Sequence, residues 1–538
     1  MSPADDATLR AMQIELKRSV EELKLPNRPP PYFVAYWTLD SDQLDIEATL
    51  GEVVRSQHEY GRRVHVELRV GSPAFDNSNF MSSFGSLEFL SESPPDAPVV
   101  APQQDPFGLR HTFWLTTDIA YKQAVAALEQ KNAARQNEVE RKDDVSNFSL
   151  EKPLTLTVDT EHHVEGDPNH EALTRRISRV FRDYPEIQES SVHLTVSTER
   201  RYFVSSEGSK VVIPTPYTEL SILCQTQADD GMGLSRWATL ASLTSLAPRE
   251  AEAVTEARRI GKELVALRSA PVMEDYSGPV LFEGKAAAQI VHDLLSEALS
   301  GTPPPKGAEA VEGPLARKLG RRILPPSFSL VDDPTLTEYE RHPLLGHYAV
   351  DDEGVPPQRV TLVEQGRLRS FLMSRAPRRE LQQSNGHGRS GLVGWARGRV
   401  GNLILKSSQG LPKAMLRARF LRVIRDEGSP FGLIVRELEP RPAGTNGLSP
   451  PEPELVYKVT PDGKEQLLRG GRFGQMSISM LRQLVAAGSE VATYDFSLPV
   501  PGGYSLPATV AAPSLLFEDV EVKKRPEPNK HPPLVPRP

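Results

Sequence analysis

Cysteine is almost absent from this chain of 538 residues, which contains only one, Cys224. A single cysteine excludes a disulfide within the chain and a zinc site built from several cysteine ligands. Cys224 ends the strand-like run 219–224, and a free cysteine in such a run is typically a small buried apolar side chain. We therefore expect Cys224 to belong to the core.

Long apolar runs are also lacking. No stretch approaches the roughly 20 apolar residues that a membrane-spanning helix needs. Residues 1–7 contain neither the basic segment nor the apolar segment of a signal peptide. These absences lead us to expect a cytoplasmic protein without a membrane partner.

An excess of positive charge is missing as well. The chain has 63 Lys and Arg residues against 71 Asp and Glu residues, which gives a net charge of -8. A nucleic-acid surface normally needs a concentrated positive field, and no basic run is interleaved with aromatic residues. We expect no direct nucleic-acid partner, although folding can still gather a local basic patch.

Fingerprints of two enzyme classes are absent. Neither phosphate-binding pattern, GxGxxG or GxxxxGK[ST], occurs between a predicted strand and a predicted helix, and there is no GxSxG motif. The sequence therefore does not support a nucleotide-dependent enzyme or a serine hydrolase.

The length of the chain predicts more than one domain, because a single core stops growing near roughly 250–300 residues. The order of helical and alternating patterns predicts an α+β fold. We expect helix-on-antiparallel-sheet units in residues 1–275, either as one unit or as two subdomains with a break near 145–155. A β-rich C-terminal domain is expected over 276–522, followed by a disordered tail over 523–538.

Local patterns locate the main elements. Helical spacing of apolar residues predicts helices over 7–24, 118–142, 170–181, 250–267 and 285–299. Period-2 alternation predicts strands over 32–37, 44–54, 63–70, 154–158, 191–196, 201–204, 220–225 and 279–282. Gln365 and Gly366 predict the tight turn of a hairpin.

The strongest chemical signal is a His-Asp-x-x-x-Glu run, His292, Asp293 and Glu297, within the helix predicted over 285–299. One interpretation is that these residues lie on the solvated face of an amphipathic helix. The other is a metal site with two ligands and a base. His292 and Glu297 are about 140° apart around an ideal helix, so they converge only if a π-bulge widens it.

Six segments, taken in order, resemble the TldD/PmbA family, which is named for modulation of DNA gyrase and includes peptidases. The likeness covers most of the chain and is most specific from 278 to 402. The segments are 278–284, 331–335, 351–356, 360–372, 384–389 and 508–521.

The resemblance assigns roles to the helical motif. In the catalytic branch of the family this helix carries HExxxH, and a cysteine near the C-terminus completes the zinc site. By position, His292 matches the first ligand, Asp293 the base and Glu297 the second ligand. Two of these three roles have changed residue type, and residues 490–516 contain neither Cys nor His. Because a zinc site normally needs three protein ligands, we expect a degenerate site without a cofactor.

Three hypotheses follow from the resemblance. The first is a noncatalytic member that binds a peptide or unfolded segment in extended form and forms a homo- or heterodimer with a family member. The alternative is an active zinc metallopeptidase, in which His292 and Glu297 bind zinc, Asp293 is the base and the third ligand is unidentified. A nucleic-acid or gyrase-binding regulator is the third, and the acidic balance argues against it.

Two further segments are candidates for contact with a ligand. The polar loop 384–389 contains Asn385, Gly386 and His387, which we predict as substrate-binding residues because function concentrates on loops. The acidic clusters 332–333 and 351–353 can either hold a hard cation or stabilise turns through their own side chains. We favour the turns.

Overall fold

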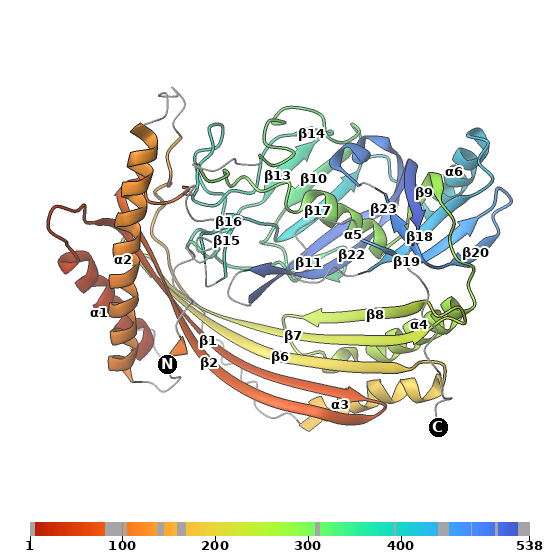
Figure 1. Cartoon of the computed structure of the whole chain (residues 1–538), viewed down its shortest axis with the longest axis horizontal. Helices are drawn as coiled ribbons and strands as arrows, with labels where there is room; N and C mark the ends of the chain where they lie inside the picture. Colours follow the sequence, from red (N-terminus) through yellow and green to blue (C-terminus); the bar gives the residue numbers. More distant parts are fainter. Residues whose placement is uncertain are drawn as a thin grey trace.

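The computed structural model confirms an α+β fold, with two halves that each contain one large sheet. A long curved sheet from the N-terminal half lies along one side of the C-terminal half (Figure 1). The structure describes residues 6–80, 99–100, 105–136, 145–158, 168–306, 312–391, 394–439, 451–474, 476–500 and 504–525.

The N-terminal sheet is continuous across the break predicted near 145–155. Its order is β3-β2-β1-β6-β7-β5, with β4 paired to β2 and β8 paired to β7. β1 pairs with β6 in antiparallel register from Ala35↔Ser205 to Ala48↔Val192. The strands are β1 Pro31–Thr49, β2 Glu52–Ser72, β3 Phe75–Asp76, β4 Val99–Val100, β5 Thr155–Thr157, β6 Glu189–Ser205, β7 Lys210–Gln227 and β8 Gly233–Ser242.

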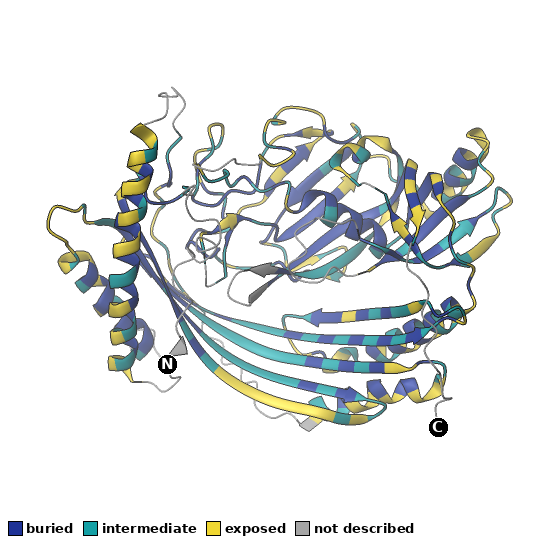
Figure 2. Ribbon diagram, viewed as in Figure 1, coloured by how far each residue is buried: buried dark blue, intermediate teal, exposed yellow. Residues whose placement is uncertain are grey.

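The strands of this sheet are longer than the sequence indicated. The predicted strands 32–37 and 44–54 belong mainly to β1, and the chain turns only at Leu50 and Gly51, which both have positive φ. A hairpin of this length exposes much of its outer strand, and the residues of β2 near the turn are exposed (Figure 2). Alternation of residue type marks strands but not their ends.

Helices cover one face of the N-terminal sheet. Helices α1 (Ala7–Glu22) and α2 (Pro106–Gln136) pack on one end, and α3 (Pro168–Arg179) and α4 (Glu250–Arg268) pack on the other. Cys224 is buried in the core under α3 and α4, as predicted. Short 3-10 helices follow α3 and precede α4 and β22; they are η3 Val180–Asp183, η4 Ala247–Arg249 and η5 Ile478–Gln483.

The opposite face of the sheet turns toward the C-terminal half. Side chains alternate between the faces of a strand, so in β1 Tyr36 and Ile46 pack under the helices while Phe33 and Trp37 point the other way. Phe33 and Trp37 share a small core with Val350 of the C-terminal half. The two halves are therefore in direct contact.

The C-terminal sheet has the order β14-β13-β10-β17-β23-β9-β18-β19-β20, with β21 and β22 also paired to β23. β23 runs parallel to β17 and antiparallel to β9 and β22. Two small strand pairs, β11 with β12 and β15 with β16, lie outside this sheet. The strands are β9 Tyr276–Phe282, β10 Phe328–Asp332, β11 Glu338–Tyr339, β12 His342–Pro343, β13 Val360–Glu364, β14 Arg367–Leu368, β15 Gly388–Arg389, β16 Arg397–Gly398, β17 Asn402–Ser407, β18 Gly432–Leu438, β19 Pro453–Val459, β20 Glu465–Leu468, β21 Gly471–Phe473, β22 Leu484–Val500 and β23 Tyr504–Lys524.

Two helices cover opposite faces of this sheet. Helix α5 (Lys285–Leu295) shares the largest core with Val280 and Phe282 of β9, whereas α6 (Lys413–Asp426) packs with Leu281 between them. The predicted turn at Gln365 and Gly366 is present between β13 and β14, and both residues have positive φ.

The C-terminal end of the chain is ordered further than its composition indicates. The tail was predicted from residue 523, but β23 continues to Lys524 and pairs there with β21. Residues 526–538 of that predicted tail lie outside the described residues. None of the helices in the described ranges is both long enough and apolar enough to cross a membrane. Location in the cytoplasm remains a prediction.

Candidate functional site

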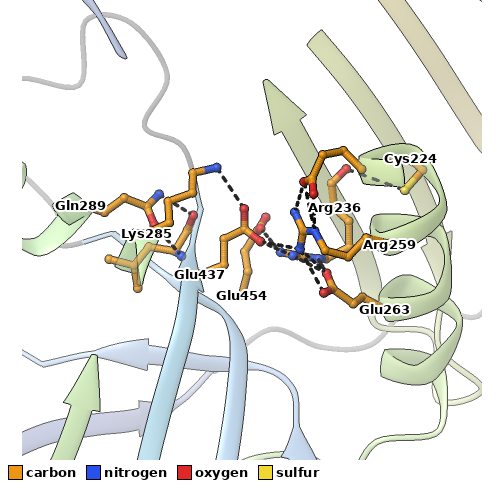
Figure 3. Close-up of polar contacts among 10 residues, drawn as sticks. Cys224, Arg236, Arg259, Glu263, Lys285, Gln289, Glu437 and Glu454 are labelled. Atoms are coloured by element: carbon orange, nitrogen blue, oxygen red, sulfur yellow. Dashed lines mark hydrogen bonds and ion pairs between the residues drawn. The ribbon is translucent and has the colours of Figure 1, made fainter. Parts of the chain in front are cut away.

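Helix α5 is anchored at its N-terminal end to the end of β18. The Lys285 ammonium lies 3.0 Å from a carboxylate oxygen of Glu437. The amide of Gln289 donates to the carbonyl of Leu438 at 2.9 Å and accepts from its N–H at 3.1 Å (Figure 3). Gln289 is buried, so the polar side of this helix is not simply a solvated face.

The same strand end belongs to a charged cluster that joins the two halves. Arg236 of β8 is fully buried and contacts Glu437 of β18, Glu454 of β19 and Glu263 of α4 (Figure 3). The distances are 2.5 Å to Glu454 and 2.7 Å to Glu263. Arg259 of α4 also contacts Glu437, at 3.3 Å. The position of α5 is thus tied to the N-terminal sheet.

The pKa values of two glutamates in this cluster are shifted in opposite directions. Burial alone would raise the pKa of Glu437, but the charges of Lys285, Arg236 and Arg259 lower it to about 2. Burial raises the pKa of Glu454 to about 7, although Arg236 opposes this shift. One oxygen of Glu454 has no hydrogen-bond partner among the described residues. The cluster therefore changes charge near neutral pH.

His292 lies on the second turn of α5 and faces aromatic side chains. Its Nδ1 is 3.0 Å from the hydroxyl of Ser296, and its Nε2 is 3.9 Å from a carboxylate oxygen of Asp293. The imidazole is centred 4.0 Å from the ring of Phe496 and 5.7 Å from the ring of Tyr494. Both aromatic residues come from β22, in the segment where the family resemblance places the third zinc ligand.

Glu297 does not converge with His292. It follows the end of α5, its side chain is 75% exposed, and its carboxylate is paired with Arg399 at 3.4 Å. Across the described ranges, no three His, Cys, Asp or Glu side chains are grouped so that they could hold a metal ion. The residues that match the zinc motif therefore do not fit a three-ligand zinc site in this arrangement.

The sequence did not indicate Tyr494 and Phe496 as neighbours of His292, because residues 490–516 were expected to contribute only a Cys or His zinc ligand. The available signal was the alternation of Tyr494, Asp495 and Phe496, which places both rings on one face of a strand. Asp495 points to the other face, where it accepts a hydrogen bond from Thr509 at 2.7 Å. Burial raises the pKa of Asp495 to about 6, against the opposing charge of Arg249.

The loop predicted to bind substrate is held inside the protein. Asn385 accepts from the N–H of Met373 at 2.8 Å and donates to the carbonyl of Phe371 at 2.8 Å. His387 is fully buried, with its Nε2 3.1 Å from Asp332. Gly386 is also buried. Contact between these three residues and a substrate remains a prediction, and in this structure their polar groups have partners within the chain.

The acidic cluster 351–353 organises a turn and meets the N-terminal sheet. Asp351 accepts hydrogen bonds from the N–H groups of Glu353, Val355 and Gly388. Asp352 pairs with Arg201 of β6 at 2.9 Å. These contacts agree with the predicted role of the acidic residues in turns, and they add a second ionic contact between the halves.

Comparison with known proteins gives relatives by sequence and neighbours by structure. Residues 275–438 match the family described as PmbA/TldA metallopeptidase C-terminal domain. A protein named Metalloprotease from Archaeoglobus fulgidus is 32% identical over 111 residues, which are 21% of this chain and 24% of that protein. Another protein of that name, from Methanothermobacter thermautotrophicus, is 25% identical over 261 residues, 48% of this chain and 53% of that protein. The matches thus span about half or less of these relatives.

Solved structures share the fold over nearly the whole chain. TldE from Thermococcus kodakarensis has a TM-score of 0.57 and 14% identity, with 96% of this chain and 100% of that chain covered. A Thermotoga maritima protein, described as a candidate modulator of a DNA gyrase, has a TM-score of 0.58 and 16% identity, covering 91% and 96% of the two chains. Residues 275–438 are thus similar in sequence to the PmbA/TldA metallopeptidase C-terminal domain, and the chain as a whole shares its fold with these solved structures.

Proposed function

We propose that this protein is a noncatalytic member of its family that binds extended peptide segments. The observation that carries the proposal is the contact of His292 with Phe496, together with the pairing of Glu297 to Arg399. An aromatic ring offers no lone pair to zinc, and a paired, exposed carboxylate at the helix end does not aim at His292. Without three converging donors, a zinc ion and its activated water have no firm site.

Peptide binding is supported by strand edges without partners. Within the described strands, β8 pairs only with β7 and β22 pairs only with β23, apart from a bridge between Gly488 of β22 and Leu411. An open edge carries free N–H and C=O groups to which an extended peptide can add as a further strand. The indole N–H of Trp237 on β8 is buried and has no acceptor in the described part of the chain, so a peptide carbonyl that displaced the groups covering it would supply the missing acceptor.

The open strand β22 approaches the N-terminal sheet where the halves meet. Tyr217 of β7 faces Ser497 and Asp495 of β22, and burial raises the pKa of its hydroxyl. β7 is the neighbour of β8 in the sheet. A peptide bound along β8 would therefore run close to β22 and to the polar residues around Tyr217.

Pairing with a catalytic family member completes the proposal. A protein that holds peptides without cleaving them needs a partner with an intact HExxxH helix if the peptides are to be hydrolysed. We therefore propose a heterodimer with such a member, or a homodimer when that partner is absent. The function of the assembly would be proteolysis in the cytoplasm.

One observation favours the alternative of a zinc metallopeptidase with a variant helix. His292 and Asp293 lie within 3.9 Å of each other, so a ligand and a base are adjacent. This alternative requires Glu297 to leave Arg399 and turn toward His292, and it requires a third ligand.

The experiment combines metal analysis, peptide binding and cleavage. We expect purified protein to contain no stoichiometric zinc, to bind a labelled extended peptide by fluorescence anisotropy, and to cleave it only after addition of an HExxxH partner. Trp237→Phe keeps an aromatic ring, although a smaller one, and removes the N–H, so it should weaken binding several-fold. Zinc at one equivalent that disappears in His292→Ala, together with cleavage by the chain alone, would establish the metallopeptidase instead.

A further inference from the structure

A groove with a volume of about 770 Å³ opens in the C-terminal half, between the segment before β10 and the start of β22. Its lining contains five cationic side chains and no acidic one. The cationic residues are Arg317, Lys318, Arg321, Arg322 and Arg482. This local charge is opposite to the net charge of the chain, which is -8.

Most of the cationic charge in the groove is uncompensated. Arg317 pairs with Glu312, which lies outside the lining. Lys318, Arg321 and Arg322 are exposed and form no ion pair with any described residue. Elsewhere in the protein, arginines such as Arg236 are paired with several carboxylates. Cations held this close repel one another, so an anion that enters the groove relieves the repulsion.

The apolar floor of the groove indicates which kind of anion fits it best. Pro325 and Pro326 provide an apolar surface beside the cations, and the buried Leu324 and Leu484 lie beneath it. A polyphosphate would leave this surface uncovered. A single-stranded nucleic acid would find no aromatic ring in the lining on which to stack its bases, and the net negative charge of the protein repels long polyanions. An acidic peptide satisfies both surfaces, because carboxylates pair with guanidinium groups and apolar side chains cover the floor.

We infer that this groove binds an acidic segment of a polypeptide, with its carboxylates on Arg321 and Arg322 and an apolar side chain on Pro325 and Pro326. The inference does not depend on the proposed function, because none of the residues around His292 lines the groove. It adds a second peptide-binding surface, selective for charge, to a protein of this family.

The test uses a short fluorescein-labelled peptide of alternating glutamate and leucine, measured by fluorescence anisotropy on the full chain. We expect saturable binding that weakens as salt is added. The double variant R321E/R322E should lose about tenfold or more in affinity. Both side chains are exposed, so the fold should be kept, and thermal unfolding of the variant checks this.

A matched control makes the same charge change elsewhere. Arg422 and Arg425 are exposed on α6 and have no carboxylate partner within the described ranges. R422E/R425E should bind the peptide as the unchanged protein does. Equal loss in both double variants would attribute the effect to net charge and overturn the inference.

Competition identifies the kind of ligand. A peptide of alternating lysine and leucine should not displace the probe. Displacement by tripolyphosphate or by single-stranded oligothymidine at lower concentrations than the acidic peptide would overturn the inference in favour of a polyanion site. If the extended peptide that tests the proposed function has no charged side chains, it should bind R321E/R322E normally, so the two proposals fail separately.

Discussion

The imidazole of His292 and the phenyl ring of Phe496 are centred 4.0 Å apart, with their planes inclined by 51°. The contact joins the second turn of α5 to β22, and Tyr494 stacks beside Phe496 on the same strand. A histidine in this setting is packed as a flat, partly apolar ring. This packing distinguishes the site from a zinc centre. In a zinc centre the same imidazole would point at a metal ion that other ligands also bind.

The first prediction concerns the two residues that match zinc ligands. Glu297→Gln should change the free energy of unfolding by less than ~1 kcal/mol, because an exposed ion pair contributes little. His292→Ala should cost about 2 kcal/mol through lost packing. Urea denaturation with and without a chelator measures both changes. A chelator that lowers the stability of the unchanged protein, but not that of His292→Ala, would show that the histidine binds a metal.

The second prediction concerns the contact between the halves. Arg236→Ala leaves Glu437 and Glu454 buried without their shared cation, so it should lower stability by about 3–5 kcal/mol. The control is Arg176→Ala, which breaks an exposed pair with Glu250 and should cost less than ~1 kcal/mol. Thermal unfolding compares the two variants, and similar losses would contradict the importance of the buried cluster.

The third prediction is a pH dependence caused by Glu454. Burial raises its pKa from the ordinary value of 4.5 to about 7 in the folded protein. The charges of Glu437 and Glu439 also raise this pKa, whereas those of Arg236 and Lys285 lower it. The folded state binds this proton more tightly, so Glu454 favours folding below pH 4.5, and this contribution is lost as the pH rises through 7. Relative to Glu454→Gln, which does not titrate, the unchanged protein should lose up to about 3 kcal/mol over that interval.

Stability curves of both proteins at closely spaced pH values check this sign. The amide of Glu454→Gln can still accept a hydrogen bond from Arg236, so the variant isolates the charge. Below pH 4.5, the pKa of Glu437 near 2 predicts a separate loss of stability as its carboxylate becomes protonated. Parallel curves for the two proteins between pH 4.5 and 7 would rule out the raised pKa of Glu454.

The fourth prediction distinguishes two glycines with positive φ. A Cβ on Gly386 (φ 72°) would lie 2.2 Å from the carbonyl oxygen of Pro356, whereas a Cβ on Gly284 (φ 55°) would meet nothing within 4 Å. Gly284→Ala should therefore cost about 1–2 kcal/mol of backbone strain. Gly386→Ala adds a clash with the main chain, so it should lower the free energy of unfolding by several kcal/mol more than Gly284→Ala does. Equal costs, measured by urea denaturation, would mean that the 384–389 loop can move.

Local patterns predicted the type of most helices and of several strands because each pattern needs only neighbouring residues. Helical spacing located α1, α4 and α5 within a few residues, and the pair Gln365 and Gly366 located a real turn. Strand lengths were underestimated, and β8 was missed, because alternation weakens where both faces of a sheet are half-buried. The predicted start of α2 was late, since its first turns at Pro106 contain exposed apolar residues that blur the pattern.

The sequence by itself determined that an amphipathic helix carries His292, Asp293 and Glu297, and that residues 490–516 supply neither Cys nor His. Only the tertiary structure decided that Phe496 covers His292 and that Arg236 meets Glu437, which is 201 residues away. The physical reason is that composition and spacing act within a few turns of chain. Contacts between distant segments depend instead on sheet register and on how the two halves pack, and short-range patterns carry no information about either.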